Sequence, residues 1–298
     1  MGKKYKLTEE TINVVGKTMY RIEAIRNFAN VKMGDKGGYV ENEGNLSQSG
    51  NCWVYCDAKV YGDAKVYGYA EVFGNAEVYG NAKVYGNAKV YGYAKVFGNA
   101  KVFGNVKLCD YTEVYGHAKL FGDAKVFGVA DVFGDAMVFG DAQVFGNAQV
   151  FGNACVYGKA VVRDHTKVRD AAKVHDEVKI NGYAKICDNS EVCDNAEVYG
   201  HAKVLGNAMV YGNAEVFGNA EVFGDSMVYE NAEVFGNAEV FGDAEVYGNA
   251  VIYDNAEVYG NAEVFGNAEV FGNAKVFGNA KVFGDAKVYG DAKINDNV

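Results

Sequence analysis

Proline is absent from all 298 residues of this chain, and tryptophan occurs once. No apolar run is long enough to cross a bilayer, and Met1-Gly-Lys-Lys lacks the apolar stretch of a signal peptide, so we expect no membrane partner. The six cysteines stand at irregular spacings and form no disulfide framework, which favours reduced thiols and a cytoplasmic location. A formal net charge of −10 argues against direct binding to nucleic acid.

A six-residue repeat of the form Gly-Asn/Asp-Ala-x-Val-Phe/Tyr fills most of the chain. Its aliphatic residue recurs 41 times in one register from Val54 to Ile294, and a small residue such as Ala58 usually stands four positions later. Because side chains alternate along a strand, the aliphatic and small residues share the inward face. The flanking Lys/Glu and Phe/Tyr side chains then point outward, since the opposite orientation would bury every charge.

Glycine and Asn/Asp occupy the two positions between these segments and predict corners, because they tolerate a positive φ better than other residues do. A helix is excluded by the period of six and by the recurrence of glycine and β-branched valine. Short strands joined by identical corners must coil, so the sequence predicts an all-β, single-stranded β-solenoid. A three-sided coil built from three repeats and a flattened, two-sided coil built from two repeats both satisfy this period.

The pattern, as in Val72-Phe-Gly-Asn-Ala-Glu-Val78, resembles the hexapeptide-repeat left-handed β-helix family over residues 54–294. That resemblance implies triangular, left-handed coils, about 14 of them. Members of the family often carry glycine directly after the aliphatic residue, whereas this chain has Phe or Tyr there. We therefore expect exposed aromatic ladders on all three sides, one of which comprises Phe217, Phe235, Tyr253, Phe271 and Tyr289.

Residues 1–53 break the repeat and predict a small β-rich cap, followed by the solenoid over 54–298. The cap resembles the leaders of uncharacterised hexapeptide-repeat proteins of phages and prophages. At the other end the repeat runs on without a cap, and a bare coil end exposes strand edges. We therefore expect homo-oligomers formed through the last coil. The candidate residues for this self-association are Phe283, Tyr289, Ile294 and Val298.

The enzymes of this family that offer a comparison are acyltransferases and a zinc carbonic anhydrase type, which generally place their histidines near loops that leave the coil. No such loop interrupts the repeat in this chain. His117 and His201 stand in corner positions separated by many repeats and cannot share a metal, and the cysteines replace residues of the repeat one by one. The sequence therefore predicts no catalytic residue, no cofactor and no metal site.

Charge is distributed in blocks along the repeat. Lysine fills most outward positions from Lys83 to Lys107, whereas no lysine or arginine occurs between Lys203 and Lys275. Duplication of near-identical repeats explains such blocks without any function, and a binding surface explains them equally well. The acidic residues that we expect to contact a partner are Glu215, Glu221, Glu233, Glu239, Glu245, Glu257, Glu263 and Glu269.

Residues 162–194 depart from the repeat. Arg, His, Asn and Cys take the aromatic positions there, and aspartate replaces the corner glycine. We interpret this band as divergent repeats with their own corner chemistry, because residues on three different faces do not converge on one ligand. A contact patch is the alternative.

These observations favour a non-enzymatic, protein-binding rod with acidic and aromatic surfaces. Its partner would be a protein with a basic surface or a second copy of the chain. One form of this hypothesis is a phage-encoded inhibitor that acts as a decoy for a host nucleic-acid-binding or defence protein. A self-assembling structural solenoid and an acyltransferase-like enzyme are the alternatives.

Overall fold

A computed structural model describes residues 2–295, which form an all-β chain with one short 3₁₀ helix. Its contacts divide the chain into two compact units, unit 1 over Met1–Gly146 and unit 2 over Asn147–Val298. Both units are built from short parallel strands of the same kind, β4 to β19 in unit 1 and β20 to β44 in unit 2. The predicted β-solenoid is therefore confirmed. These 41 strands, at three to a turn, make about 14 turns.

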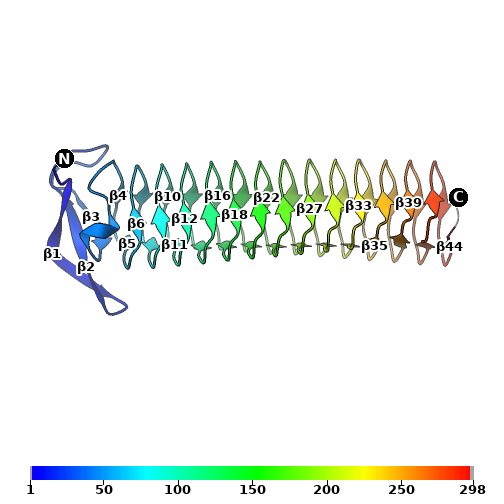
Figure 1. Cartoon of the computed structure of the whole chain (residues 1–298), viewed down its shortest axis with the longest axis horizontal. Coiled ribbons are helices and arrows are strands. Elements are labelled where there is room, and N and C mark those ends of the chain that lie inside the picture. The colour runs from blue at the N-terminus through cyan, green and yellow to red at the C-terminus, as the bar shows by residue number, and fades with distance from the viewer. Residues whose placement is uncertain (1, 296–298) are drawn as a thin grey trace. The chain divides into compact units, whose positions relative to one another are not determined.

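Unit 1 begins with an antiparallel hairpin, which Figure 1 shows at the blue end. Tyr5 and Ile22 of this hairpin are fully buried. The third strand joins the hairpin to the solenoid, because Val40 pairs in parallel with Val60. The predicted division at residue 53 stays a prediction. The elements of this region are β1 (Tyr5–Val14), β2 (Lys17–Ala24), β3 (Lys36–Val40) and the 3₁₀ helix η1 (Glu43–Asn45).

Within unit 1, solenoid strands pair in parallel with the strand three places further along the chain, so that Lys89 pairs with Lys107. This register confirms three-sided coils and excludes the two-sided coil. The first face comprises β4 (Trp53–Val54), β7 (Glu71–Val72), β10 (Lys89–Val90), β13 (Lys107–Leu108), β16 (Lys125–Val126) and β19 (Gln143–Val144). The second comprises β5 (Lys59–Val60), β8 (Glu77–Val78), β11 (Lys95–Val96), β14 (Glu113–Val114) and β17 (Asp131–Val132). The third comprises β6 (Lys65–Val66), β9 (Lys83–Val84), β12 (Lys101–Val102), β15 (Lys119–Leu120) and β18 (Met137–Val138).

Unit 2 repeats this arrangement of three faces. The first face comprises β22 (Val161–Val162), β25 (Lys179–Ile180), β28 (Glu197–Val198), β31 (Glu215–Val216), β34 (Glu233–Val234), β37 (Val251–Ile252), β40 (Glu269–Val270) and β43 (Lys287–Val288). The second comprises β20 (Gln149–Val150), β23 (Lys167–Val168), β26 (Lys185–Ile186), β29 (Lys203–Val204), β32 (Glu221–Val222), β35 (Glu239–Gly242), β38 (Glu257–Gly260), β41 (Lys275–Val276) and β44 (Lys293–Ile294). The third comprises β21 (Cys155–Val156), β24 (Lys173–Val174), β27 (Glu191–Val192), β30 (Met209–Val210), β33 (Met227–Val228), β36 (Glu245–Val246), β39 (Glu263–Val264) and β42 (Lys281–Val282).

The core is built from the residues that the repeat pattern assigns to it. The aliphatic and alanine positions, such as Val216 and Ala220, are fully buried through most of both units. Serine replaces alanine at two of these positions and satisfies its hydroxyl locally. Ser190 Oγ donates to the carbonyl of Cys187 at 2.7 Å, and Ser226 Oγ donates to the carbonyl of Phe223 at 3.0 Å. A buried hydroxyl is tolerated there because a corner carbonyl accepts its proton.

The corners explain why glycine recurs. Gly200 has a φ of 70°, and a Cβ atom there would lie 2.9 Å from the carbonyl oxygen of Gly218 in the next coil. Aspartate takes the same conformation at several corners, with φ near 60°. Its carboxylate then accepts from the backbone N–H of the next coil, as Asp194 Oδ2 does from Gly212 at 3.0 Å. Aspartate corners with the same bond also occur outside residues 162–194, at Asp110 and Asp254, so the interpretation of that band as divergent repeats stays a prediction.

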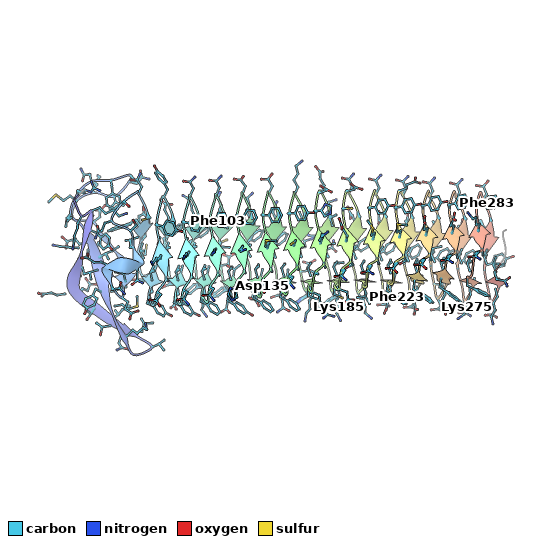
Figure 2. The ribbon with its side chains drawn as sticks, in the orientation of Figure 1. Phe103, Asp135, Lys185, Phe223, Lys275 and Phe283 are labelled. Atoms are coloured by element: carbon cyan, nitrogen blue, oxygen red, sulfur yellow. The ribbon has the colours of Figure 1, made fainter. Side chains whose placement is uncertain are left out.

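Aromatic ladders line the outward side of the strands, and Phe103 and Phe223 illustrate their direction in Figure 2. The predicted ladder of unit 2 is confirmed, because Phe217 and Phe235 stack with ring centroids 4.7 Å apart and the stacking continues to Tyr289. Most rings of the ladders are only partly exposed, since each covers its neighbours. The ladders are therefore less exposed than we expected.

Candidate functional site

The eight glutamates predicted to contact a partner lie on all three faces of unit 2 and do not form one patch. Glu215, Glu233 and Glu269 are on the first face, Glu221, Glu239 and Glu257 on the second, and Glu245 and Glu263 on the third. A partner that docks on one face therefore contacts at most three of them. Three of these glutamates follow one another without interruption on the second face alone.

The second face of unit 2 carries a column of charge with a sharp change of sign. Each residue of the column pairs with the next across neighbouring parallel strands, about 4.8 Å apart. We call this set the charge column. In chain order it consists of Lys167, Lys185, Lys203, Glu221, Glu239, Glu257, Lys275 and Lys293.

Ion pairs form where the sign changes. Lys203 Nζ lies 2.5 Å from Glu221 Oε1, and Lys275 Nζ lies 2.6 Å from Glu257 Oε1. The hydrogen bond to Glu257 raises the pKa of Lys275. The side-chain carboxylate of Glu239, between the two paired glutamates, has no hydrogen bond or ion pair within residues 2–295. Its carboxylate is thus the uncompensated centre of the acidic half.

On the other two faces, tyrosine hydroxyls compensate part of the acidic charge. Tyr199 Oη donates to Glu215 Oε2 and Tyr229 Oη donates to Glu245 Oε2, both at 2.9 Å. Burial of the hydroxyl and the nearby carboxylate raise the pKa of both tyrosines. Glu233 has no such partner in the described part of the chain.

Lysine compensates the remaining two glutamates, which lie near the far end of unit 2. Lys281 Nζ lies 2.7 Å from Glu263 Oε1, and Lys287 Nζ lies 2.7 Å from Glu269 Oε1. Lysines that flank the lysine-free block at both of its ends therefore form ion pairs with its outer glutamates. Among the eight predicted glutamates, Glu233 and Glu239 are the two whose carboxylates have no hydrogen bond or ion pair within residues 2–295.

A stack of rings borders the basic half of the charge column. His165, Tyr183 and His201 occupy successive corners, with centroid distances of 4.8 Å and 4.9 Å. Together with Lys185 and Lys203 they line a groove of about 360 Å³. Sequence reasoning compared His201 with the distant His117 and did not relate it to His165. The signal that it missed is their separation by six repeats, which amounts to two complete coils.

The self-association candidates are spread over three faces as well. Phe283 is 47% exposed on the third face and Tyr289 is 62% exposed on the first. Ile294 belongs to β44 on the second face and is partly buried. Val298 lies outside the described residues. No single face collects the described members of this set, so the prediction that they form one contact stays untested.

Within residues 162–194, sequence reasoning missed one convergence of side chains. Cys187 and Cys193 lie on the second and third faces, as we expected. His175, Glu191 and Cys193 however share the third face, and one ligand atom from each lies within 4.8 Å of the others. The convergence follows from the coil, because Cys193 stands three repeats after His175 and so returns to the same face.

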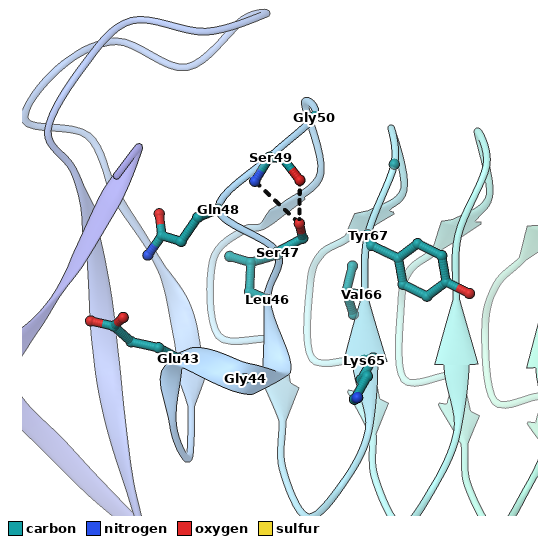
Figure 3. Close-up of a pocket in the computed structure, with 11 residues that line it drawn as sticks. Glu43, Gly44, Leu46, Ser47, Gln48, Ser49, Gly50, Lys65, Val66 and Tyr67 are labelled. Atoms are coloured by element: carbon teal, nitrogen blue, oxygen red, sulfur yellow. Dashed lines mark hydrogen bonds between the residues drawn. The ribbon is translucent and has the colours of Figure 1, made fainter. Parts of the chain in front are cut away.

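A hollow of about 650 Å³ lies in unit 1 between the cap and the solenoid (Figure 3). Its walls combine glycine backbone with apolar side chains such as Leu46 and Val66 and with polar ones, and Ser47 Oγ accepts from the backbone N–H of Ser49 at 3.1 Å. Glu43 at its rim is already paired with Lys3 at 2.7 Å. We therefore base no function on this hollow.

Among residues 2–295, no helix has the length and apolar character needed to cross a membrane. A family model described as the YdcK β-solenoid repeat matches residues 148–164. This segment contains β20, β21 and β22, which form one turn of unit 2. No curated protein matches the chain. Fold and comparison agree that this is a repeat β-solenoid protein, similar over one turn to the YdcK repeat.

Proposed function

We propose that the chain is a non-enzymatic scaffold that associates with a second copy of itself through the second face of unit 2. The observation that carries the proposal is the charge column, in which three lysines are followed directly by three glutamates. Consider a two-fold axis that runs along the strand direction between β29 and β32. It would place the basic half of the column in one copy against the acidic half of the column in the other. Lys167 would then face Glu257 of the second copy, Lys185 would face Glu239, and Lys203 would face Glu221.

The neighbouring outward column supports the same arrangement. This column consists of the residues two positions after each charge, which are Arg169, Cys187 and Leu205 in the basic half and Phe223, Phe241 and Tyr259 in the acidic half. Under the same axis Leu205 would meet Phe223, and Arg169 would meet Tyr259. An apolar contact at the centre and a cation on an aromatic ring at the edge are both favourable. A self-complementary patch of this kind is what a two-fold dimer requires.

Energetics predict a salt-sensitive dimer. Exposed ion pairs contribute about 0–1 kcal/mol each, and salt screens them. The two-fold axis produces each of the three facing ion pairs twice. The summed free energy of all these pairs therefore decides whether the dimer forms. Glu239, which lacks a partner within the described chain, gains one in the dimer. Association thus relieves the like-charge repulsion of the acidic half.

The test is light scattering after size exclusion, at low and high salt. We expect a dimer at low salt and dissociation at high salt. Changing the three lysines of the basic half to glutamate should give a monomer, and so should changing the three facing glutamates to lysine. A mixture of these two variants should restore the dimer, and so should a single chain that carries all six changes.

A matched control alters the same amount of charge on the first face. Glu197, Glu215 and Glu233 are changed together to lysine, and circular dichroism verifies that every variant keeps its β structure. The control should stay dimeric. A wild-type monomer at low salt and high concentration, or equal loss of the dimer in the control, would contradict the proposal.

A second candidate function is binding of a basic protein by the acidic residues, as a phage-encoded decoy for a nucleic-acid-binding or defence protein. Glu233 and Glu239 favour it, because neither has an internal partner among the described residues. Its phage origin rests on the resemblance of residues 1–53 alone. The test is binding of a polylysine peptide, with duplex DNA as competitor. Changing both glutamates to glutamine should weaken binding strongly, and unchanged affinity would rule this candidate out.

A further inference from the structure

The third face of unit 2 brings together three side chains of different ligand chemistry. His175 follows β24, and Glu191 and Cys193 flank the buried valine of β27, the next strand on that face. An imidazole nitrogen, a carboxylate oxygen and a thiol sulfur all lie within 4.8 Å of one another. All three residues are partly buried, and the His175 side chain is 15% exposed.

Two carboxylates hold the imidazole of His175 between them. Nδ1 lies 2.8 Å from Asp176 Oδ2, and Nε2 lies 2.8 Å from Glu191 Oε1. A neutral imidazole carries one proton, so an Nδ1–H that donates to Asp176 leaves the Nε2 lone pair directed at a carboxylate oxygen. Two electron-pair donors at this distance need a proton or a metal ion between them. A histidine that donates one N–H to a carboxylate and offers its other nitrogen is the arrangement found at zinc ligands.

We propose that His175 Nε2, the Glu191 carboxylate and Cys193 Sγ bind a zinc ion, with Asp176 as a positioning residue for the imidazole. Nitrogen, oxygen and thiolate sulfur together suit zinc, whereas magnesium and calcium prefer oxygen ligands alone. Three protein ligands leave one position of a tetrahedral zinc ion for water or a partner's side chain. Lys173 contacts the other oxygen of Glu191, Oε2, at 3.3 Å and leaves Oε1 available.

A neighbouring cluster serves as an internal comparison. Asp170, Cys187 and Asp188 also place three ligand atoms within 4.8 Å. In that cluster, however, a cation is already present, because Arg169 Nη1 lies 3.2 Å from Asp170 Oδ2. The carboxylate of Asp188 is also used at the corner, where it accepts from the N–H of Gly206 at 2.9 Å. The cluster lacks a histidine and its charge is compensated, so we assign the zinc ion to the third face.

The zinc ion would also make up for a missing stacking contact in the aromatic ladder at Cys193. His175 stacks on Tyr157 at 4.6 Å, and the ladder resumes with Tyr211 and Tyr229 at 4.8 Å. Cys193 leaves a gap between these stretches, since its thiol cannot stack. A metal ion held by residues of two successive coils would bridge the gap and stabilise unit 2, because binding energy adds to folding energy. This role is independent of association through the second face.

The test uses the full chain, freed of metal with a chelator, and titration calorimetry with zinc chloride. We expect one tight site and a rise in the unfolding temperature. Cys193→Ser and His175→Phe should abolish that site. The second change restores the ring that the repeat carries elsewhere, so the variant should remain folded. Asp176→Asn should weaken binding about tenfold or more, because it weakens the orienting hydrogen bond. The asparagine amide oxygen can still accept the backbone N–H of Asp194, which lies 3.4 Å from Asp176 Oδ2, so the corner should be kept.

Cobalt and a matched cysteine variant complete the design. The cobalt complex of the wild type should show a thiolate-to-cobalt charge-transfer band that Cys193→Ser removes. Cys109→Ser, which changes a cysteine in an equivalent position of unit 1, should keep both the zinc site and the band. Absence of tight zinc binding by the wild type would overturn the proposal. So would unchanged binding in Cys193→Ser and His175→Phe, or a cobalt complex without sulfur character.

Discussion

Glu239 pairs residue to residue with Glu257 across the parallel strands β35 and β38. These strands extend over four residues each, so two like charges are held side by side on a regular sheet. The carboxylate of Glu257 forms an ion pair with Lys275, whereas the carboxylate of Glu239 has no hydrogen bond or ion pair in the described chain. This relationship makes Glu239 the residue at which charge neutralisation should stabilise the fold most.

Glu239→Gln should therefore raise the free energy of unfolding by about 0.5 kcal/mol, since like charges on facing strands repel. Urea denaturation at low salt measures the change, at protein concentrations low enough to keep the chain monomeric. Glu257→Gln is the control, because it removes an ion pair as well as a repulsion and should have little effect. An unchanged urea midpoint for Glu239→Gln would show that the repulsion is already screened, and a lower midpoint would contradict the prediction.

The aromatic ladder should contribute measurably to stability. Phe235 stacks on Phe217 at 4.7 Å and on Tyr253 at 5.2 Å. Phe235→Ala should cost about 1–3 kcal/mol, because two stacked pairs and their buried area are lost. Phe235→Leu should cost less, since leucine keeps much of the apolar area and occupies this position of the repeat naturally at Leu205. Urea denaturation of both variants compares them, and equal losses would mean that the ladder depends on stacking alone and gains nothing from the retained apolar area.

Corner glycines should tolerate aspartate better than alanine. Gly200→Ala places a Cβ atom in a left-handed corner close to Gly218 and should cost about 1–2 kcal/mol or more. Gly200→Asp should cost less, because its carboxylate can accept from the N–H of Gly218, as Asp194 accepts from Gly212. Thermal unfolding of both variants, followed by circular dichroism, compares them. The idea fails if aspartate is the more harmful residue.

The pair of Tyr247 and Glu263 should make stability depend on pH in both directions. Burial and the nearby carboxylate raise the pKa of Tyr247 from 10.0 to about 12, so its contribution is complete below pH 10 and is lost as the pH rises through 12. The hydrogen bond from Lys281 lowers the pKa of Glu263 from 4.5, so its contribution is present above that value and is lost as the pH falls. Unfolding temperatures from pH 3 to 12 test both. Tyr247→Phe should flatten the alkaline limb more than the acidic limb, which it also affects because the Tyr247 hydroxyl donates to Glu263.

Lys4 should be essential to the cap although it is charged. It is fully buried, and its ammonium donates to the carbonyl oxygens of Cys52 at 2.7 Å and Gly50 at 3.2 Å. Burial lowers the pKa of Lys4. Lys4→Met should cost about 1–3 kcal/mol, because two carbonyls lose their donor. Thermal unfolding measures this cost, and Lys3→Met is the control, since its exposed ion pair with Glu43 contributes about 0–1 kcal/mol.

Much of the fold could be predicted because the repeat constrains each position independently. Val216 and Ala220 had to face inward and the corner glycines had to take a positive φ, since the alternatives bury charge or crowd a Cβ atom. The candidate site was less accessible to such reasoning. The glutamates from Glu215 to Glu269 read as one block along the chain, but coiling distributes them over three faces. Conversely His175, Glu191 and Cys193 stand in separate repeats of the sequence, and coiling brings them together.

By itself, the sequence determined the six-residue register, the inward and outward positions and the corners, because strand alternation, desolvation of charge and backbone sterics act within a few residues. Only the tertiary structure decided which residues become neighbours across strands. That depends on how many segments close one turn, and coils of two segments or of three satisfy the local rules equally. Closure after three segments places Glu239 beside Glu257 and His175 near Cys193. The chemistry of this protein follows from those long-range neighbours, which no local preference specifies.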